Sequence, residues 1–469
     1  MTQARTFLTQ VLGRRGPGIV DAIHAAHGFL RGSTVPELLR RVGHSIAEVP
    51  RASHLDKRFI QASYRGDITR PPDDLLTGSG VFYITEQRRL YLDCTAGHYQ
   101  MTWGYNHPRL NALVCEAIQS GIVWDDHSNI PGNPVKHLSH RLVEAANGRK
   151  PAAAGPADEG SLNTVLLGVC TGSVAASSAV KITLRHHETV RPGVVPTLIA
   201  LRGNYHGTDF LAQRMRGMWK KYFRGITFVE IEPNDLSMLR KTFAAHRGRV
   251  AAMFVEPVLM NREAILLERD YLREARALCD RADACLVIDE IQTGFWYPGI
   301  FLYHDYGVLP DIVVVGKGMT AGLHPLSAIV YKAKYDRLEQ YDAISTNGNA
   351  PLAAVAGLGS MALVEEERRR IDALGRFYFE RLGELVGAGR GRVSAIHGKG
   401  LLAGVKFCKV SDALEFHRRS LARGLWVRVH AYHEGHSTVL TKLALAADRQ
   451  VVDFVVNTFR EILEEMDHG

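Results

Sequence analysis

Residues 311–318 read Asp311-Ile312-Val313-Val314-Val315-Gly316-Lys317-Gly318, and residues 286–294 read Leu286-Val287-Ile288-Asp289-Glu290-Ile291-Gln292-Thr293-Gly294. Each contains a short, continuous apolar run, which is the pattern of a strand buried on both faces of a parallel sheet. Lys317 and Asp289 therefore lie at the carboxyl ends of two strands. Because ligands of open α/β sheets bind beyond this edge, the sequence predicts a site that holds an amine and a carboxylate.

The same pattern recurs through the middle of the chain. Helical stretches such as residues 271–282 fall between some of the apolar runs. Strands that alternate with helices predict a mostly parallel sheet that is covered on both faces. The expected strands are residues 164–169, 197–201, 226–231, 251–255, 285–288 and 312–315.

The two ends of the chain follow other patterns. Thr34-Val35-Pro36-Glu37 combines a capping box with a proline in the first helical turn, so a helix is expected there. Residues 80–95 resemble a small antiparallel meander. Beyond about residue 350, helices and strands predict an α+β domain. The elements expected in it are a helix ending at Glu365-Glu366-Glu367, a helix from Arg369, strands 400–407, 425–429 and 438–445, and a helix over 451–466.

Composition is that of an ordinary globular enzyme. The 469 residues, 46% of them hydrophobic and 23% charged, suffice for two domains. The net charge of +8 suits anionic ligands. With no nucleic-acid module and no apolar run of membrane-spanning length, we expect no nucleic-acid or membrane partner. Met1–Val20 contains three arginines and no acid, as in transit peptides, but an amphipathic helix is the favoured interpretation.

Cysteine and histidine usage argues against disulfides and metals. The cysteines lack Cys-x-x-Cys spacing and lie in apolar contexts, so we expect reduced, buried thiols and a cytoplasmic protein. Three histidine pairs have short spacings, but no cysteine or carboxylate completes a zinc set, so no metal is expected. The cysteines are Cys94, Cys115, Cys170, Cys279, Cys285 and Cys408, and the histidine pairs are His24 with His27, His137 with His140, and His433 with His436.

A lysine and an aspartate at strand ends fit one cofactor, pyridoxal 5'-phosphate (PLP). The Lys317 amine can form a Schiff base with the PLP aldehyde. The Asp289 carboxylate can hold the pyridine nitrogen protonated, so that the ring accepts electrons. The pair therefore predicts chemistry on amines.

Several motifs occur in the order and at about the spacing of one enzyme family. They are Glu256-Pro257-Val258, Val287-Ile288-Asp289-Glu290-Ile291-Gln292-Thr293-Gly294-Phe295, and Pro310-Asp311-Ile312-Val313 with Gly316-Lys317-Gly318. With these motifs the chain resembles the class III (omega or ornithine-type) aminotransferases, PLP enzymes of fold type I, from about Tyr91 to the C-terminus. The resemblance implies an α/β large domain with a mostly parallel seven-stranded sheet and helices on both faces. It also implies a smaller α+β domain from the N- and C-terminal parts.

These patterns divide the chain into four expected segments. The two small-domain segments are expected to pack together, although they lie far apart in the sequence. The segments are an N-terminal helical arm or cap (1–75), the N-terminal part of the small domain (76–110), the PLP-binding large domain (111–349) and the C-terminal part of the small domain (350–469).

The resemblance also implies roles for single residues. Lys317 would carry the cofactor and move a proton between the substrate Cα and the cofactor, and Asp289 would bind the pyridinium nitrogen. Gln292 resembles the glutamine that contacts the phenolic oxygen of PLP. Tyr205, in Asn204-Tyr205-His206-Gly207, is expected to stack on the pyridine ring. His206 is either a supporting residue behind the cofactor or a buried core histidine.

Two segments are expected to bind the cofactor phosphate. Gly172 and Ser173 follow a strand and begin a helix, where backbone N–H groups and a hydroxyl form an anion site. The family continues with an acid and later an asparagine where this chain has Val174 and Ala176, so the backbone is expected to supply most of the binding. Thr346 resembles the threonine that reaches the cofactor of the neighbouring subunit, which implies a homodimer with active sites at the subunit interface.

Two substrate positions depart from the family pattern. Many members place a glutamate five residues after the Glu256 position and pair it with an arginine near the C-terminal strand. Here Asn261 holds the first position and Leu440 the second, with Lys442 nearby. Because losing one partner alone would leave a buried charge, we hypothesise that glutamate is not anchored in the usual way. Lys442 or another cation would then bind a different acidic group of the substrate.

The sequence therefore predicts a PLP-dependent aminotransferase that moves an amino group between a small-molecule amine donor and an aldehyde, ketone or oxo acid by a ping-pong mechanism. The divergent loop 259–267 favours a specialised substrate of secondary metabolism. Racemases or epimerases, aminomutases and decarboxylases share the fold and cofactor, and the sequence does not reveal which Cα bond breaks. A non-catalytic protein would not need both Lys317 and Asp289, and no Gly-x-Gly-x-x-Gly motif supports a nicotinamide dehydrogenase.

Overall fold

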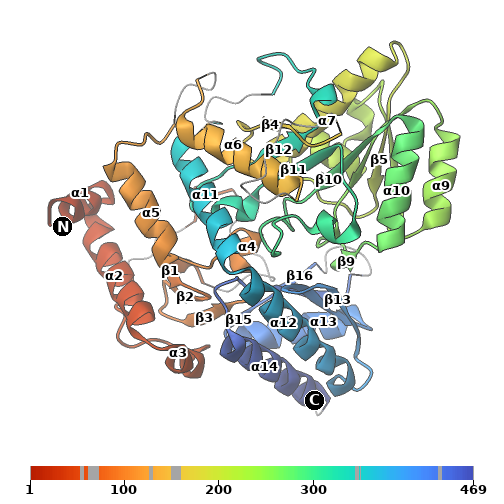
Figure 1. The fold of residues 1–469 in the computed structure, drawn as a ribbon. Coiled ribbons are helices and arrows are strands. Elements are labelled where there is room, and N and C mark those ends of the chain that lie inside the picture. Colours follow the sequence, from red (N-terminus) through yellow and green to blue (C-terminus); the bar gives the residue numbers. More distant parts are fainter. Residues whose placement is uncertain are drawn as a thin grey trace. The chain divides into compact units, whose positions relative to one another are not determined.

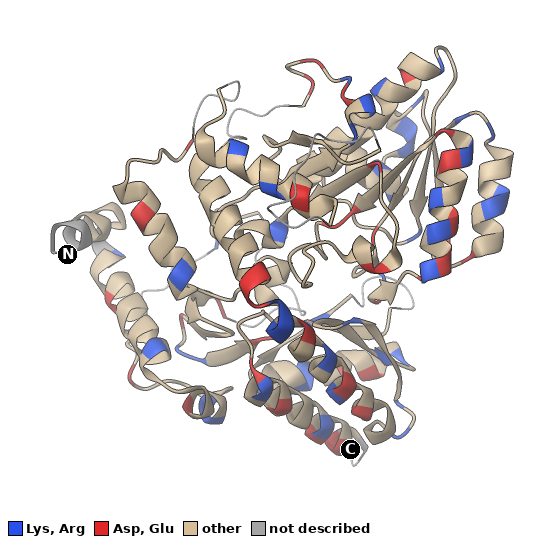
Figure 2. Cartoon of the chain, viewed as in Figure 1, with Lys and Arg blue, Asp and Glu red and all other residues tan. Residues whose placement is uncertain are grey.

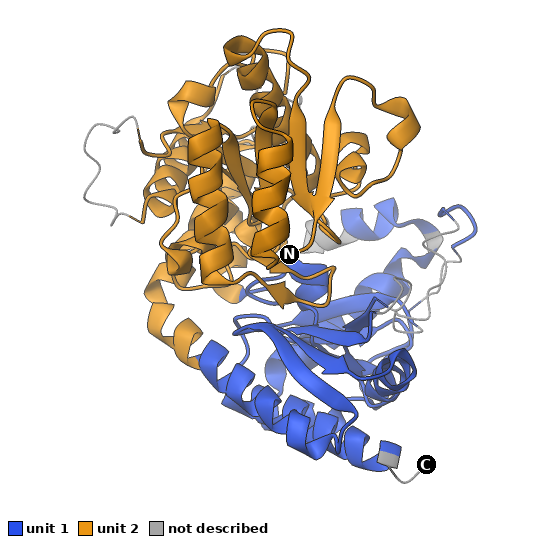
Figure 3. Ribbon diagram, turned by 90° about the vertical axis from the view of Figure 1, so that its right-hand side faces the viewer, with its two compact units in different colours: residues 1–107, 374–469 blue, residues 108–373 orange. Residues whose placement is uncertain are grey.

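The computed structural model describes residues 2–52, 57–61, 73–125, 130–148, 160–343, 348, 350–430 and 436–467. The chain forms two compact units, which Figure 3 shows in different colours. Unit 1 combines Met1–His107 with Leu374–Gly469, and unit 2 is Pro108–Ala373. The two ends of the chain thus build one unit, and the middle builds the other.

A seven-stranded sheet forms the centre of unit 2 (Figure 1). Its strand order is β4-β12-β11-β10-β7-β5-β6. Only β12 is antiparallel to its neighbours among these strands, so the sheet is mostly parallel, as the sequence predicts. The strands are β4 (Thr164–Leu166), β5 (Thr197–Leu201), β6 (Thr227–Ile231), β7 (Val250–Val255), β10 (Cys285–Asp289), β11 (Ile312–Val315) and β12 (Ala328–Tyr331).

Helices cover both faces of this sheet. Every residue of β7, β10 and β11 is buried, which requires cover on each side. Helix α7 (Gly172–Val190) packs against β7, β10, β11 and β12. Helix α10 (Arg269–Ala282) packs against β7 and β10, and α9 (Leu236–Ala245) packs against α10 and β6.

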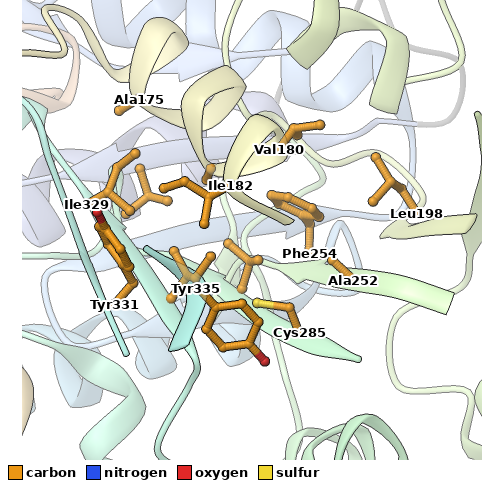
Figure 4. Packing of buried hydrophobic residues seen from close by; sticks show 14 of the residues in the cluster. Ala175, Val180, Ile182, Leu198, Ala252, Phe254, Cys285, Ile329, Tyr331 and Tyr335 are labelled. Carbon is orange, nitrogen blue, oxygen red and sulfur yellow. The ribbon is translucent and has the colours of Figure 1, made fainter. Parts of the chain in front are cut away.

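One hydrophobic cluster fixes α7 on the sheet (Figure 4). Ala175 and Ile182 of α7 belong to the same buried cluster as Phe254 of β7 and Val287 of β10, and each is at most 1% exposed. Burying a large apolar side chain contributes about 1.5–3 kcal/mol. The cluster therefore holds the N-terminus of α7, with Gly172 and Ser173, at a set place on the sheet.

Helix α11 (Pro351–Glu366) belongs to unit 2, although the sequence analysis assigned residues from 350 onward to the C-terminal domain. It packs against α5 (Pro108–Gln119) and α6 (Asn133–Ala146). Close packing depends on small residues, because a Cβ at Gly359 would overlap the Leu113 side chain of α5. The division of the chain accordingly falls at Leu374, inside the next helix, α12 (Arg368–Ala388).

Unit 1 contains two four-stranded sheets. In the sheet of order β1-β2-β3-β15, the last strand is parallel to β3 and comes from the C-terminal part of the chain. The sheet of order β13-β14-β17-β16 is antiparallel throughout. The strands are β1 (Leu75–Ser79), β2 (Phe82–Thr85), β3 (Leu90–Asp93), β13 (Val393–Lys399), β14 (Leu402–Phe407), β15 (Leu425–Trp426), β16 (Arg428–Val429) and β17 (Thr438–Lys442).

The N-terminal helices pack as part of unit 1 rather than as a separate arm. Helix α2 (Gly16–Gly32) packs against β1 and β2. The expected capping box begins α3 (Val35–Arg41), where Glu37 Oε2 accepts a hydrogen bond from Thr34 N at 2.7 Å. The remaining helices of the unit are α1 (Thr2–Val11), α4 (Ala96–Tyr99), α13 (Val410–Ala422) and α14 (Arg449–Asp467).

Surface charges of both signs alternate on the outer helices (Figure 2). On unit 2, Arg240 of α9 donates to Glu274 of α10 at 3.0 Å. Over the residues that the structure describes, no helix has the length and apolar character needed to cross a membrane. Within the same ranges, no group of three or more histidine, cysteine or acidic side chains could hold a metal ion, and His433 lies outside them.

The cysteines only partly follow the expectation of burial. Cys94, Cys279 and Cys285 are buried, and all six thiols are free. Cys115 and Cys408 are exposed and Cys170 is half-buried, so the prediction is wrong for these three. Apolar neighbours in sequence do not decide which face of a helix or turn a single side chain occupies.

Candidate active site

Four neighbouring strands of unit 2 bring the candidate site together at their carboxyl ends. The strands are β11, β10, β7 and β5, in this spatial order. Lys317 follows β11, Asp289 ends β10, Glu256 follows β7 and Tyr205 follows β5. The parallel register places Ile288 beside Val255 and Asp289 beside Val314, so these strand ends are level. The chain therefore delivers an amine, two carboxyls and an aromatic ring to one edge.

The backbone at Lys317 has a special conformation. Its φ of 44° is left-handed, which is uncommon outside glycine. Gly316 before it approaches β12 closely, because a Cβ there would overlap Ser327 Oγ. Lys317 Nζ lies 5.7 Å from the centroid of the Tyr205 ring. The turn thus directs the amine toward Tyr205.

Asp289 is bound to His206 in the interior. Their side chains are 3% and 0% exposed, and His206 Nδ1 lies 2.7 Å from Asp289 Oδ2. Asp289 Oδ1 accepts a second hydrogen bond from Ile291 N at 2.9 Å. Burial lowers the pKa of His206, but the hydrogen bond to Asp289 and the charge of Asp289 outweigh it, so the net pKa is raised. The pair therefore favours a protonated imidazole beside the Asp289 carboxyl.

Glu290, the next residue, has a different environment. Its carboxyl accepts hydrogen bonds from Tyr303 N at 2.9 Å and from the Thr293 hydroxyl. Burial raises the pKa of Glu290 to about 8. Both contacts come from the segment that follows β10, so Glu290 acts as a structural group that holds its own loop together.

Glu256 links the two sides of the site, and sequence reasoning did not propose it as a site residue. Its Oε2 accepts from Tyr205 N at 2.7 Å, and its Oε1 accepts from Gln292 Nε2 at 3.1 Å. Gln292 Nε2 also donates to Asn261 Oδ1 at 3.3 Å. Burial, opposed by the charge of His206, raises the pKa of Glu256 to about 7. Its place after a buried strand, like that of Asp289, was the signal available in the sequence.

The N-terminus of α7 packs against the loop that carries Tyr205. Ser173 Oγ accepts a hydrogen bond from Thr208 N at 3.0 Å. Gly207 has a φ of 122°, and a Cβ there would overlap Ser173. A Cβ at Gly172 would lie 3.1 Å from the side chain of Ile291. Gly207 thus allows the Tyr205 loop to approach the helix start, and Gly172 leaves room for Ile291 of the segment after β10. The helix start brings backbone N–H groups and the Ser173 hydroxyl together, as an anion site requires.

The structure also locates the other residues expected in the site. Asn261 contacts Gln292, whereas Lys442 lies in unit 1 and is fully buried, with its Nζ 4.8 Å from the centroid of the Tyr99 ring. Thr346 lies outside the described residues. Arg216, which the sequence analysis did not consider, has its guanidinium carbon 5.1 Å from the centroid of the Tyr205 ring.

An amine, a buried carboxylate, a ring and a helix N-terminus at one edge of a mostly parallel sheet define the class of PLP enzymes with an α/β fold. The family model of class III aminotransferases (Aminotransferase class-III) matches residues 72–463. The chain belongs to this family, and the resemblance predicted from the motifs is confirmed.

Relatives and solved structures agree with this assignment. The omega-aminotransferase of Caulobacter vibrioides is 25% identical over 89% of this chain and 99% of its own length. The acetylornithine aminotransferase of Caldanaerobacter subterraneus is 26% identical over 88% of this chain and 98% of its own. The crystal structure of ornithine aminotransferase from Toxoplasma gondii matches with a TM-score of 0.75 and 22% identity, covering 89% of this chain and 96% of that chain.

The family assignment confirms the fold class and the general activity. The mostly parallel α/β architecture is the fold-type I architecture of the solved aminotransferases. Class III aminotransferases depend on PLP, so this chain is a PLP-dependent transaminase acting on small-molecule amines and carbonyl compounds.

Proposed function

We propose that the strand-end cluster of unit 2 is the transamination site, and that it works by a ping-pong mechanism with Lys317 as its reactive amine. The observation that carries the proposal is the convergence of Lys317, Asp289 and Tyr205 at level strand ends. The residues fit PLP, because they combine a buried carboxylate for the ring nitrogen, a ring for stacking and a glycine-lined helix start for the phosphate. When bound, PLP supplies an aldehyde that captures amines and a ring that accepts electrons.

Lys317 has two proposed tasks. Its Nζ would hold the cofactor through the aldehyde and, once displaced by a substrate amine, would be a free amine that moves a proton to and from the substrate Cα. Tyr205 supports both tasks, because its ring lies beside Nζ and offers an apolar face that excludes water. The left-handed turn at Lys317 sets the direction of the amine.

Asp289 and His206 are proposed to hold the ring nitrogen of the cofactor in its protonated form. The Asp289 carboxyl would accept a hydrogen bond from the ring N–H, while His206 holds Asp289 in place through the 2.7 Å contact. A neighbouring opposite charge shifts a pKa by about 1 to 3 units. His206 thus has a supporting role, the first of the two alternatives that the sequence left for it.

Gln292 is proposed to bind the phenolic oxygen of the cofactor. Glu256 and Asn261 both accept from Gln292 Nε2, which fixes the orientation of the amide. Gln292 Oε1 is an acceptor, so it would bind the phenolic oxygen by accepting from its O–H group. Glu256 also accepts from Tyr205 N, so the stacking residue and the amide are oriented by one carboxyl. Asn261 is thereby a positioning residue rather than a direct ligand of the substrate.

Phosphate binding and subunit assembly are proposed together. Gly172 and Ser173 would bind the 5'-phosphate through backbone N–H groups and the Ser173 hydroxyl. Thr346 would reach the phosphate of a second subunit, so the enzyme would be a homodimer. Sedimentation analysis should find a dimer, and Thr346→Ala should weaken PLP binding; a fully active monomer would contradict this part of the proposal.

The cell location and the pathway remain predictions. A cytoplasmic location is supported by six free thiols. Specialised metabolism rests on the loop 259–267, where Arg262 donates to Arg202 O at 2.8 Å and pairs with Glu232 at 2.6 Å. These contacts fix the loop, which supports a substrate pocket of defined shape.

Borohydride reduction of the PLP-loaded enzyme, followed by peptide mass spectrometry, tests the site. The cofactor label should be found on Lys317 and be lost in Lys317→Ala. Lys332 is a matched control, because it also follows a strand but pairs with Asp311 at 2.8 Å, and it should carry no label. Loss of the visible cofactor absorbance on adding amine donors should accompany formation of the carbonyl product. A label elsewhere would refute the site, and racemised or decarboxylated product without carbonyl formation would refute the reaction.

A further inference from the structure

Arg216 places a second cation beside the site. It follows α8 (Phe210–Met215), and its guanidinium carbon lies 5.1 Å from the centroid of the Tyr205 ring. Lys317 Nζ lies 5.7 Å from the same centroid. The separation of the two cations therefore cannot exceed the sum of these distances. A small amine bound at Lys317 could reach Arg216 with its other end.

The Arg216 guanidinium has no acidic partner among the residues that the structure describes. In the ranges that the structure describes, it forms no ion pair and no hydrogen bond, and it contacts the Tyr205 ring. Arg202 and Arg262 both pair with Glu232, at 2.7 and 2.6 Å. Within the same ranges, Arg214 also lacks an ion pair, but it is buried and lies over the Phe228 ring. Arg216 is therefore the half-buried, unpaired guanidinium beside Tyr205.

The surroundings of Arg216 carry an excess of positive charge. Glu230 is the nearby acid, and burial raises its pKa, against the lowering effect of the cations around it. Those cations are Lys220, Arg202, Arg214 and Arg216. Because Arg202 is already paired with Glu232, one half-buried carboxyl faces the three remaining cations, which leaves the region electropositive. An anionic ligand group would be attracted there.

We infer that Arg216 binds the carboxylate of the amine or oxo acid substrate and thereby determines specificity. The inference rests on the proposed function, because it places the reacting carbon at Lys317. A guanidinium presents a planar fork of donors that matches a carboxylate in two parallel hydrogen bonds. A half-buried guanidinium also gains more from such a partner than one in bulk water.

Two other residues were candidates for binding an acidic group of the substrate, and the structure shows both of them in other contacts. Asn261 Oδ1 accepts from Gln292. Lys442 is fully buried in unit 1 against Tyr99, whereas Arg216 is only half-buried. Of the three, Arg216 is the one that combines a charge, solvent access and a contact to the ring next to Lys317. Arg216 therefore fits the hypothesis from the sequence that a cation other than Lys442 binds an acidic group of the substrate.

Donor pairs that differ in one group test the inference. Isopropylamine is alanine with a methyl group in place of the carboxylate, and butylamine is γ-aminobutyrate with the same replacement. For each pair, the ratio of KM for the acid-bearing donor to KM for the plain amine is measured by the loss of cofactor absorbance. A hydrogen-bonded charge pair accounts for about 10- to 100-fold in affinity. Arg216→Gln should therefore raise the ratio by about this factor.

Two further variants and a binding measurement complete the design. Arg216→Lys keeps the charge without the fork and should give an intermediate ratio. Lys221→Gln removes an equal charge from the same segment, where Lys221 Nζ lies over the Tyr222 ring, and should leave the ratio as in the wild type. The dissociation constants of propionate and butyrate, which cannot react, should rise in Arg216→Gln by about the same 10- to 100-fold.

The outcomes separate this inference from the proposed function. If Arg216→Gln slows both members of each pair equally, Arg216 acts only by supporting Tyr205, and the inference is overturned. If the wild-type enzyme converts none of the donors, the proposed function fails. The dissociation constants of propionate and butyrate then test by themselves whether Arg216 forms a carboxylate site. Weaker binding in Arg216→Gln would still support a carboxylate site at Arg216, and unchanged binding would overturn it.

Discussion

Asp311 and Asp289 lie at opposite ends of the strands of one sheet, and their electrostatic surroundings differ. The amino edge is the side where the parallel strands begin, and the carboxyl edge is the side where they end. At the amino edge, Asp311 precedes β11 and pairs with Arg276 at 2.7 Å and Lys332 at 2.8 Å. Burial alone would raise the pKa of Asp311, but these two cations make it lower than usual. Leu286 N donates to Asp311 at 2.9 Å, which ties β10 to the network. The carboxylate is thus fully neutralised by the protein.

At the carboxyl edge, the charges are arranged differently. Asp289 pairs with His206, and Glu256 has a pKa raised to about 7 by burial. The cations Lys317 and Arg216 lie beside the Tyr205 ring. The comparison teaches that a carboxylate held between two cations stabilises a fold, whereas a strand end that gathers acids, cations and an aromatic ring is suited to binding a ligand.

The largest expected effect belongs to the amino edge. Asp311→Ala leaves Arg276 and Lys332 without their shared partner, and breaking a buried pair in this way costs about 3–5 kcal/mol. Urea denaturation should show that loss in the free energy of unfolding, with kcat retained where the fold is intact. Arg240→Ala removes an exposed ion pair and should cost about 1 kcal/mol or less. Lost activity with unchanged stability in Asp311→Ala would break the comparison.

The carboxyl edge should respond in the opposite way. Asp289→Asn keeps the shape and the acceptor for Ile291 N but removes the charge proposed to hold the ring nitrogen protonated. We expect kcat/KM to fall by about 10²- to 10³-fold. Because His206 can lose its proton once its charged partner is removed, the free energy of unfolding should fall by less than in Asp311→Ala. The exposed Asp280→Asn serves as the control. Near-normal kinetics in Asp289→Asn would refute the assigned role.

The pH dependence of stability should also differ between the edges. The folded-state pKa of Glu256 is raised to about 7, so between its unfolded value and 7 the folded state binds more protons, and stability falls as pH rises through this window. The pKa of Asp311 is lowered, so its contribution is lost as pH falls below its unfolded value. Glu256→Gln should reduce the loss of stability between pH 5 and 8 by roughly 1–3 kcal/mol. An identical pH profile in this variant would contradict the assignment.

The smallest effect is expected at the cofactor phosphate. Ser173→Ala removes one hydroxyl from the cradle but leaves the backbone N–H groups. The dissociation constant for PLP, followed by fluorescence titration, should rise about 2- to 10-fold. Ser177→Ala, in the same helix, removes a hydroxyl that bonds Asp209 and should change PLP affinity less. An equal effect of both substitutions would argue against a specific role for Ser173.

Six of the seven strands in the sheet of unit 2 could be predicted because they carry strong local signals, whereas β12 was not among the expected strands. β5 and β11 begin and end where their apolar runs do, and β10 ends at Asp289. The sequence missed β13, since its exposed and half-buried residues show no clean alternation. Residues 425–429 read as one strand but form β15 and β16, because each half pairs with a different sheet. Pairing partners of this kind are decided by tertiary packing rather than by local pattern.

Single residues of the site could be predicted from the sequence, but the contacts that connect them could not. Lys317 and Asp289 could be identified because each ends an apolar run. The contact of His206 with Asp289 joins residues 83 positions apart, so no local pattern contains it. The same holds for Arg216, whose approach to Tyr205 depends on the turn after α8. The apolar runs in the sequence identify reactive groups at their ends. The folded structure is needed to show which of these groups contact one another through hydrogen bonds or charges.

The antiparallel direction of β12 has a consequence for Lys317. Because β12 runs back beside β11, with Val315 opposite Ala328, the chain leaves and re-enters the sheet around the lysine. Both ends of residues 316–327 are therefore tethered to one hairpin, unlike a connection that runs on into a long crossover helix. Moving the lysine backbone requires opening that ladder, so the reactive segment is rigid before any cofactor arrives. Limited proteolysis and hydrogen exchange of the apoprotein should find it among the last parts of unit 2 to open.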